Sequence, residues 1–290
     1  MLPGIGPGDL VEEGLGGLSL AAPPLGEGVR LDSLFVDPMT GAVSDQGLYL
    51  VTSDDGLVTA YNFGIEPPLV EDPLAPSSCQ DRGYRLVGSP PAKWEQRFDW
   101  YFNSSGVPSE VDPGNAEEAF RDSVRTITGA GNDCNPPLPD NVSATANYLG
   151  STSRDAVPNF SCPWDNFNVI RFGAGSGFGL AATCTRIVDS VILESDTRLY
   201  TTEYEWYVVP GPNCDPVNNP KWHVTGVTTH ERGHTFGLAH TNNPQSPGHP
   251  YHVLGDTHPF LTMGGGPTAL CDERQASLGL GDILGLEQLY

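Results

Sequence analysis

The 290-residue sequence is short of basic residues. It has 14 Lys and Arg against 36 Asp and Glu, so its formal net charge is −22 at pH 7. Such a balance repels phosphate backbones and anionic lipid surfaces, and we therefore expect no nucleic-acid partner. The acidity could reflect a salt-tolerant surface or an affinity for cations, but simple solubility is the interpretation that we favour.

Long apolar runs are also missing. No stretch approaches the roughly 20 apolar residues that a membrane-spanning helix needs, so we expect no membrane span. The N-terminus, Met1 to Ile5, has neither a basic start nor an apolar run, and it does not predict a signal peptide. The length suits one large domain or two modest ones, and a hydrophobic content of 38% is sufficient for a sizeable core.

The six cysteines form no C-x-x-C pair, which argues against a thiolate metal site. An even number at wide spacing is typical of disulfides in an oxidising compartment, so we expect a secreted protein whose signal peptide has been removed. Fifteen pairings of six cysteines are possible. The pairs that we expect are Cys79–Cys134, Cys162–Cys184 and Cys214–Cys271. The alternative is six reduced, buried thiols.

The stretch from His230 to His240 carries the chemistry and reads H-E-x-x-H-x-x-G-x-x-H. On a helix, His230 and His234 project from one face, where they can bind one zinc ion. Glu231 lies beside the first ligand, within reach of a water on the metal. Gly237 can adopt the left-handed backbone that ends a helix, and the turned chain brings His240 back as a third ligand. Three protein ligands leave a fourth position for water, which is the catalytic arrangement.

This stretch resembles the extended zinc signature of the metzincin metallopeptidases. A bare H-E-x-x-H could arise by chance, but Leu261 to Gly265 follows at a suitable distance and is similar to the Met-turn of that family, with Met263 beneath the metal. Thr241 resembles the Ser that follows the third His in the matrixin subfamily. Gly265 stands where other subfamilies carry a Tyr ligand, so that ligand should be missing here. Residues 280–290 resemble the last matrixin helix.

The resemblance covers roughly residues 76–290 and implies an α+β catalytic domain of the metzincin type. Such a domain has a twisted, mixed five-stranded sheet that is mostly parallel with one antiparallel edge strand, and two long helices back it. A zinc cleft lies below the sheet, and a small C-terminal subdomain carries the Met-turn and the final helix. The residue pattern itself predicts a helix from Asp112 to about Thr128 that ends at Gly129.

The resemblance also implies where a substrate would bind. The edge strand that pairs with substrate in metzincins corresponds here to Gly179, Leu180, Ala181 and Ala182. A free strand edge can pair with an extended peptide, and small side chains would let that peptide lie close to the sheet. The alternative is an ordinary strand. The family segment that lines the pocket for the residue after the cut corresponds to Gly264, Gly265 and Pro267.

Residues 1–75 are interpreted as an N-terminal extension or pro-region. Residues 1 to about 30 show no steady period and are expected to be disordered or loosely attached. Residues 48–52 and 57–61 are strand-like runs around a Ser-Asp-Asp-Gly turn, which resembles a hairpin. Matrixin pro-regions block the zinc with a cysteine. No cysteine precedes Cys79, so this form of latency should be absent.

Two further metal sites are considered. Carboxylate and amide oxygens suit calcium, although no EF-hand spacing is present. The side chains that could contribute are those of Asp215, Asn218 and Asn219. Three histidines of the loop before Met263 could tune substrate binding, hold a second metal or simply be solvated. They are His249, His252 and His258.

The expected function is that of a secreted, monomeric, zinc-dependent endopeptidase. It would act on protein or peptide substrates, with one catalytic Zn²⁺ and with Glu231 as general base and acid. The alternative from another class is a catalytically silent, secreted binding or adhesion module that keeps the same scaffold. A zinc hydrolase of non-peptide amides is a third interpretation, which the edge strand disfavours.

Overall fold

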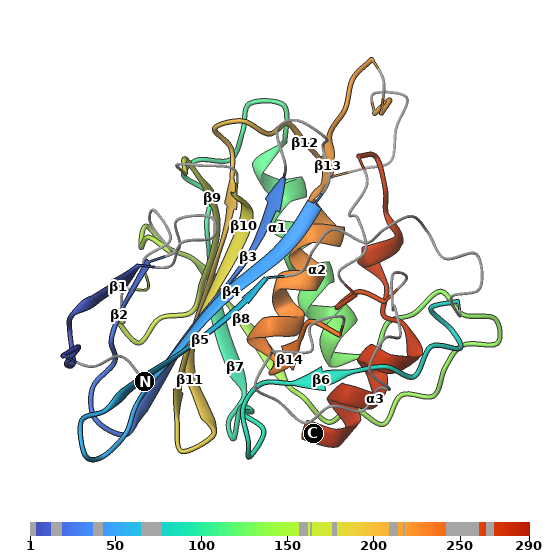
Figure 1. Cartoon of the computed structure of the whole chain (residues 1–290). Helices are drawn as coiled ribbons and strands as arrows, with labels where there is room; N and C mark the ends of the chain where they lie inside the picture. Colours follow the sequence, from blue (N-terminus) through green and yellow to red (C-terminus); the bar gives the residue numbers. More distant parts are fainter. Residues whose placement is uncertain are drawn as a thin grey trace.

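The structure, a computed structural model, describes most of the chain. The described residues are 4–12, 19–36, 43–64, 77–156, 162, 164–175, 179–208, 214–216, 218–241, 261–264 and 270–290. They form a large mixed sheet with α-helices packed on one face (Figure 1). The α+β class is thus confirmed, while the metzincin assignment stays a prediction.

Within the described residues, the central sheet has eight strands rather than the expected five. In spatial order they are β5 (Val58–Gly64), β4 (Val43–Thr52), β3 (Glu27–Val36), β10 (Gly179–Val188), β11 (Val191–Tyr200), β9 (Val169–Gly173), β7 (Phe98–Asn103) and β8 (Ala146–Ser151). Strands β11, β9, β7 and β8 pair in parallel, and β10 is antiparallel to β11. The four parallel strands and the one antiparallel strand agree with the expected directions, but β10 is not at the edge of the sheet. The three additional strands all come from the N-terminal extension.

The N-terminal extension is better ordered than its composition predicts. The hairpin is confirmed, because β4 and β5 pair antiparallel around the turn after Thr52. Two short strands, β1 (Leu10–Glu12) and β2 (Ser19–Ala21), form a small sheet of their own. The expectation of a loosely attached N-terminus is therefore wrong for these strands and for the start of β3. Apolar residues of both β1 and β2 are buried, which offsets the conformational entropy of ordering them.

Three α-helices occur in the described chain: α1 (Pro113–Thr128), α2 (Val224–Thr235) and α3 (Leu280–Leu289). The start and end of α1 follow the sequence prediction. The Asp112 carboxylate accepts hydrogen bonds from the backbone N–H groups of Gly114 and Asn115, and Gly129 is the C-cap residue. None of the described helices is long and apolar enough to cross a membrane.

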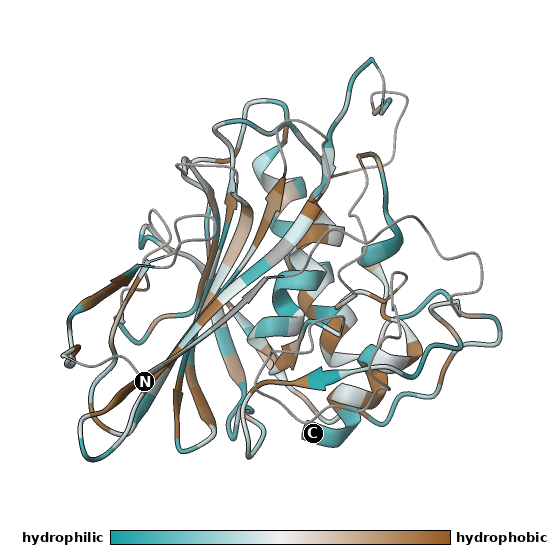
Figure 2. Cartoon of the chain, viewed as in Figure 1, coloured by the Kyte–Doolittle hydropathy of each residue, from teal (hydrophilic) through white to brown (hydrophobic). Residues whose placement is uncertain are grey.

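Two buried apolar clusters lie against the sheet, one on each face. On one face, side chains of the sheet pack against α1 and α2, with Phe98 edge-on to Phe236 at a centroid distance of 5.4 Å. On the other face, residues of β3 and β4 such as Leu31 and Leu48 pack with Val11 of β1. Figure 2 shows brown, hydrophobic segments on several strands of the sheet, whereas α2 is mostly white and teal beyond its first turn. Each buried side chain of this size contributes roughly 1.5–3 kcal/mol relative to exposure.

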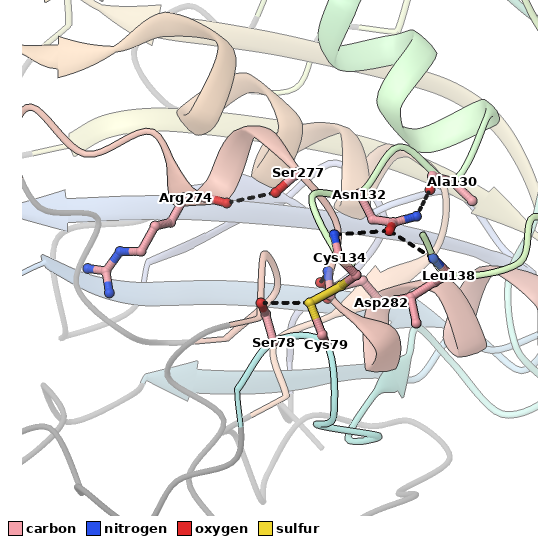
Figure 3. The surroundings of a disulfide bond; sticks show 10 residues. Ser78, Cys79, Ala130, Asn132, Cys134, Leu138, Arg274, Ser277 and Asp282 are labelled. Carbon is pink, nitrogen blue, oxygen red and sulfur yellow. Dashed lines mark hydrogen bonds between the residues drawn. A yellow bond between two sulfur atoms is a disulfide. The ribbon is translucent and has the colours of Figure 1, made fainter. Parts of the chain in front are cut away.

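All six cysteines form the three expected disulfides: Cys79–Cys134, Cys162–Cys184 and Cys214–Cys271. The first joins the chain before β6 (Arg85–Leu86) to the loop after α1, where Asn132 holds the loop through hydrogen bonds to Ala130, Cys134 and Leu138 (Figure 3). Three disulfides and the lack of a membrane-spanning helix among the described residues are compatible with an extracellular protein.

Candidate metal centre

Helix α2 carries two of the three candidate metal ligands. Its residues His230 and His234 are both buried between the helix and its neighbours. Directly after the helix, Gly237 has a φ of +89°, as expected for the turning residue. A Cβ atom there would lie 2.3 Å from the carbonyl oxygen of Ala92, so the close approach of two backbones also demands glycine. The chain then reverses toward the third ligand.

A two-residue strand positions His240. Strand β14 (Leu238–Ala239) pairs antiparallel with β6, and the backbone N–H of Val87 donates to the carbonyl of Gly237. These main-chain bonds fix the direction in which the chain leaves the helix. The structure therefore brings His230, His234 and His240 together, with one ligand atom of each within 4.8 Å of the others. This is the only such group of three His, Cys, Asp or Glu residues in the described part of the chain.

Backbone carbonyls fix the tautomers of two of these histidines. The Nδ1 atom of His230 lies 2.6 Å from the carbonyl oxygen of Thr262, and the Nδ1 atom of His234 lies 3.1 Å from that of Leu238. Because a carbonyl only accepts, each Nδ1 must carry the proton, and each Nε2 then presents a lone pair. Carbonyl partners of this kind are the usual support of metal-binding histidines.

The Nε2 atoms converge on one point. The Nε2 of His230 lies 3.2 Å from the Nε2 of His234 and 3.2 Å from that of His240. Two nitrogens bound to one zinc ion at about 2.0–2.1 Å with tetrahedral angles would lie roughly 3.3 Å apart. Unprotonated nitrogens that face one another at this distance repel unless a cation lies between them. The donor set and its spacing therefore fit a metal ion held by three imidazoles.

Burial keeps the imidazoles neutral. It lowers the pKa of His230 to about 3, with the neighbouring His234 adding to the effect, and it lowers the pKa values of His234 and His240 well below the ordinary value. Neutral imidazole is the form that binds metals. At neutral pH the three side chains are therefore ready to bind a metal without first losing a proton.

Met263 lies directly beneath helix α2. The side chain is 1% exposed, and a Cβ atom at Gly233 of the helix would lie 2.1 Å from the Met263 Sδ. Glycine at this position inside H-E-x-x-H therefore makes room for the sulfur. The backbone N–H of Thr241 donates to the carbonyl of Met263, which ties the turn to the chain that follows His240. The predicted position of Met263 is consistent with this packing.

We expect the substitution Gly233→Ala to destabilise the protein by about 1–3 kcal/mol, the usual effect of inserting a methyl group into a filled site. Gly226→Ala in the same helix is the matched control. Its Cβ would meet no atom closer than 3.4 Å, so alanine should be neutral or slightly stabilising there. Denaturant unfolding of both variants checks this. If the two variants were equally stable, the close contact between residue 233 and the Met263 sulfur would be contradicted. Adding Met263→Ala to the Gly233→Ala variant should restore part of the lost stability.

Asp282 of helix α3 anchors the turn that contains Met263. Its carboxylate accepts hydrogen bonds from the backbone N–H groups of Thr262, Met263 and Gly279. Burial raises its pKa to about 6, against the lowering effect of these donors. The carbonyl of Thr262 in turn accepts from His230. The final helix is thus connected to the metal ligand through two hydrogen bonds.

Replacing Asp282 by Asn should destabilise the protein by about 1–3 kcal/mol at pH 7.5, where the carboxyl group is ionised, because an amide NH₂ cannot accept from backbone N–H groups. The metal affinity should also fall, by about 10–100-fold, because the support of His230 is loosened. Asp272→Asn, which changes a carboxylate paired with Arg274, is the control. Chemical unfolding and competitive metal titration measure the two effects. Unchanged metal affinity in a folded Asp282→Asn variant would show that the connection to His230 is unimportant.

Glu231 lies on α2 below strand β10. Its Oε2 atom accepts a hydrogen bond of 2.5 Å from the hydroxyl of Thr183, which is also hydrogen-bonded to Thr197. Its Oε1 atom has no hydrogen-bond partner among the described residues. Burial raises the pKa of Glu231 to about 8 in this closed arrangement. One carboxylate oxygen is therefore held in place and the other is free to act.

The expected substrate edge is not free. Strand β10, which contains Gly179, Leu180, Ala181 and Ala182, pairs with β11 on one side and with β3 on the other. The prediction of an edge strand at these residues is therefore wrong for the chain as it stands. It fails because β3 lies about 150 positions earlier in the sequence, and no local pattern in β10 reports such a partner.

The remaining predicted positions are only partly described. Gly264 donates its backbone N–H to the carbonyl of Leu261 and so closes the turn around Met263. Gly265 and Pro267 lie outside the described residues, as do His249, His252 and His258. In the proposed calcium loop, the Asp215 carboxylate accepts from the side-chain amide of Asn218, and Asp215 and Asn219 form a backbone bridge. Calcium binding there stays a prediction.

Sequence reasoning missed four contributors to this site: Arg30, Asp32, Thr183 and Asp282. Arg30 and Asp32 form a buried ion pair in β3, with Asp32 Oδ1 3.9 Å from His234 Nδ1. The sequence does contain a signal for that pair. Arg30 and Asp32 alternate with the apolar residues Val29 and Leu31, so the two charges lie on one face of the strand. Comparison with known proteins adds no further guide, because no family model and no curated protein sequence matches this chain.

Proposed function

We propose that the protein is a zinc-dependent endopeptidase of the metzincin type, similar to the matrixins. The observation that carries the proposal is the convergence of three neutral imidazoles beside the buried carboxyl group of Glu231, whose pKa is raised. In His230 and His234 the hydrogen bond at Nδ1 leaves the Nε2 lone pairs facing each other. The resemblance of residues 230–240 and of the turn at Met263 to the metzincin signature supports it. The secreted location inferred from the disulfides suits an enzyme that acts on proteins outside the cell.

The residues divide the chemistry between them. Zn²⁺ held by His230, His234 and His240 would keep a fourth position for water, lower the pKa of that water and stabilise negative charge on the attacked carbonyl oxygen. Glu231 accepts the proton of the attacking water at Oε1 and then delivers it to the leaving amine. Thr183 holds Oε2 during both transfers and so keeps the carboxylate oriented. Met263 fills the apolar space under the ligands without binding the metal.

One observation favours the second candidate, a catalytically silent binding module on the same scaffold. The exposed fraction of His230, Glu231, His234 and His240 is between 0 and 2%, and β10 has no free edge in the described chain. A peptide substrate cannot reach such a site without a change in the protein. Hydrolysis of casein by the zinc-loaded protein, before and after residues 1–64 are cut away, decides between the two. Hydrolysis in either state supports the peptidase, and its absence in both supports the binding module.

A further inference from the structure

We propose that the N-terminal strands β3 to β5, residues 27–64, are an internal substitute for substrate that keeps the metal centre closed until they are released. The effect that we expect on hydrolysis rests on the proposed function. The closure of the metal centre does not rest on it, because the closure concerns only whether a ligand can reach the three histidines. The sequence predicts latency by cysteine to be absent, and this arrangement uses strand pairing in its place.

Strand β3 occupies the edge of β10 over its whole length. Nine residue pairs join the two strands in antiparallel register, from Gly179 with Phe35 to Val188 with Glu27. The other edge of β10 is taken by β11. An extended peptide binds a sheet edge through the same main-chain groups, so it cannot pair with β10 while β3 is present. Strands β4 and β5 continue the sheet beyond β3, away from β10 (Figure 1).

The side chains of β3 also close the centre. Asp32 lies opposite Thr183, the residue that holds Glu231, and its Oδ1 atom is 3.9 Å from Nδ1 of His234. Arg30 binds the Asp32 carboxylate through two hydrogen bonds of 2.5 and 2.6 Å, and both side chains are at most 1% exposed. A lone carboxylate would be costly to bury here, and its pairing with Arg30 offsets that cost. The strand thus fits against the histidines without leaving an unpaired charge.

The closing strands are attached to the rest of the chain without a disulfide. All six cysteines lie at position 79 or later, so no disulfide ties residues 1–64 to the rest of the chain. The rest of the chain has its own cross-links, its own helices and the five strands β7 to β11. The noncovalent links that the structure shows for β3 include the pairing with β10, the ion pair between Glu27 and Arg186, and a buried apolar cluster that joins Leu31 to Ala182 and Cys184. A single cut between residue 64 and Cys79 therefore turns the closing segment into a separate chain.

The test measures access to the metal without measuring hydrolysis. The recognition sequence of a site-specific protease replaces residues 66–72, and the protein is produced with Co²⁺ so that visible absorption reports binding of acetohydroxamate, a small metal ligand. The dissociation constant of acetohydroxamate is determined for the uncut protein. It is determined again after cutting, at a protein concentration where gel filtration shows that the N-terminal fragment has dissociated. If fewer than one uncut molecule in ten is open, cutting should tighten hydroxamate binding at least about tenfold. Leu31→Asp, which charges the apolar face of β3, promotes release if the fragment stays bound.

A covalent lock is the matched control. Glu27 and Val188 are directly opposite each other at the ends of β3 and β10, so the pair Glu27→Cys and Val188→Cys can form a disulfide across the strands. The locked protein should stay closed after the cut. Equal hydroxamate affinity of the uncut, cut and locked proteins would overturn the closure.

The same samples separate this inference from the proposed function. Tighter hydroxamate binding after the cut with no casein hydrolysis in any sample would leave the closure standing and reject the peptidase. Hydrolysis that is equal before and after the cut would support the peptidase and reject the closure. Hydrolysis that appears only after the cut, and not in the locked protein, is the result that we expect.

Discussion

Glu231→Gln should abolish peptide hydrolysis by the opened, zinc-loaded protein, with a loss of at least roughly 10²–10⁴-fold in kcat/KM. The amide of Gln can still accept the hydrogen bond of Thr183 but cannot take up a proton from water. Because Gln has nearly the same size and shape as Glu, the substitution should leave the packing of α2 intact and should not destabilise the fold. The loss should therefore appear in the chemical step and not in the amount of folded protein.

Three measurements make this result interpretable. Zinc content and thermal unfolding of the Glu231→Gln variant should match those of the parent, since Glu231 is not one of the three imidazole ligands. Glu203→Gln, which changes an exposed carboxylate, should hydrolyse casein at the parent rate. Equal hydrolysis by the parent and the Glu231→Gln variant would show that another group is the base, or that the activity belongs to a contaminating protease.

Zinc should raise the melting temperature of the metal-free protein by roughly 5–10 °C at a free concentration one hundred times its dissociation constant. Binding to the folded state alone stabilises by about 2.7 kcal/mol at that ratio. A chain of this size gains roughly 2–4 °C per kcal/mol. The three imidazoles are neutral and already converge, so little reorganisation opposes binding.

His230→Gln should remove this shift, because two imidazoles remain and the oriented lone pair of His230 is lost. His223→Gln is the control for the loss of a buried histidine. His223 is also buried, and its pKa is lowered to about 4, but it stacks on Tyr207 outside the metal cluster. The His223→Gln variant should keep the full zinc shift. Retention of the shift in the His230→Gln variant, measured by calorimetry, would place the metal elsewhere.

Local patterns predicted the parts of the structure that depend on neighbouring residues. Asp112 and Gly129 marked the ends of α1 because capping is decided within one turn. The zinc motif placed two imidazoles on one helix face, and Gly237 took the predicted left-handed backbone. The three disulfides were also as expected.

The features that sequence reasoning missed depend on partners far apart in the chain. Whether β10 is an edge is decided by β3, and whether residue 233 must be glycine is decided by the position of the Met263 sulfur. Asp282 has the ordinary appearance of a polar residue near a helix start, and its three backbone donors come from a turn about 20 positions earlier and from Gly279. Sheet register and close packing of this kind follow from the whole fold.

The most direct test of the zinc peptidase is a titration of the opened, metal-free protein with zinc while hydrolysis of a quenched fluorescent peptide mixture is followed. We predict no hydrolysis without metal, a linear rise up to one equivalent of zinc and no rise in the Glu231→Gln variant. Hydrolysis that is independent of zinc, or a protein that binds one equivalent at the three histidines and cleaves no peptide, would contradict the account.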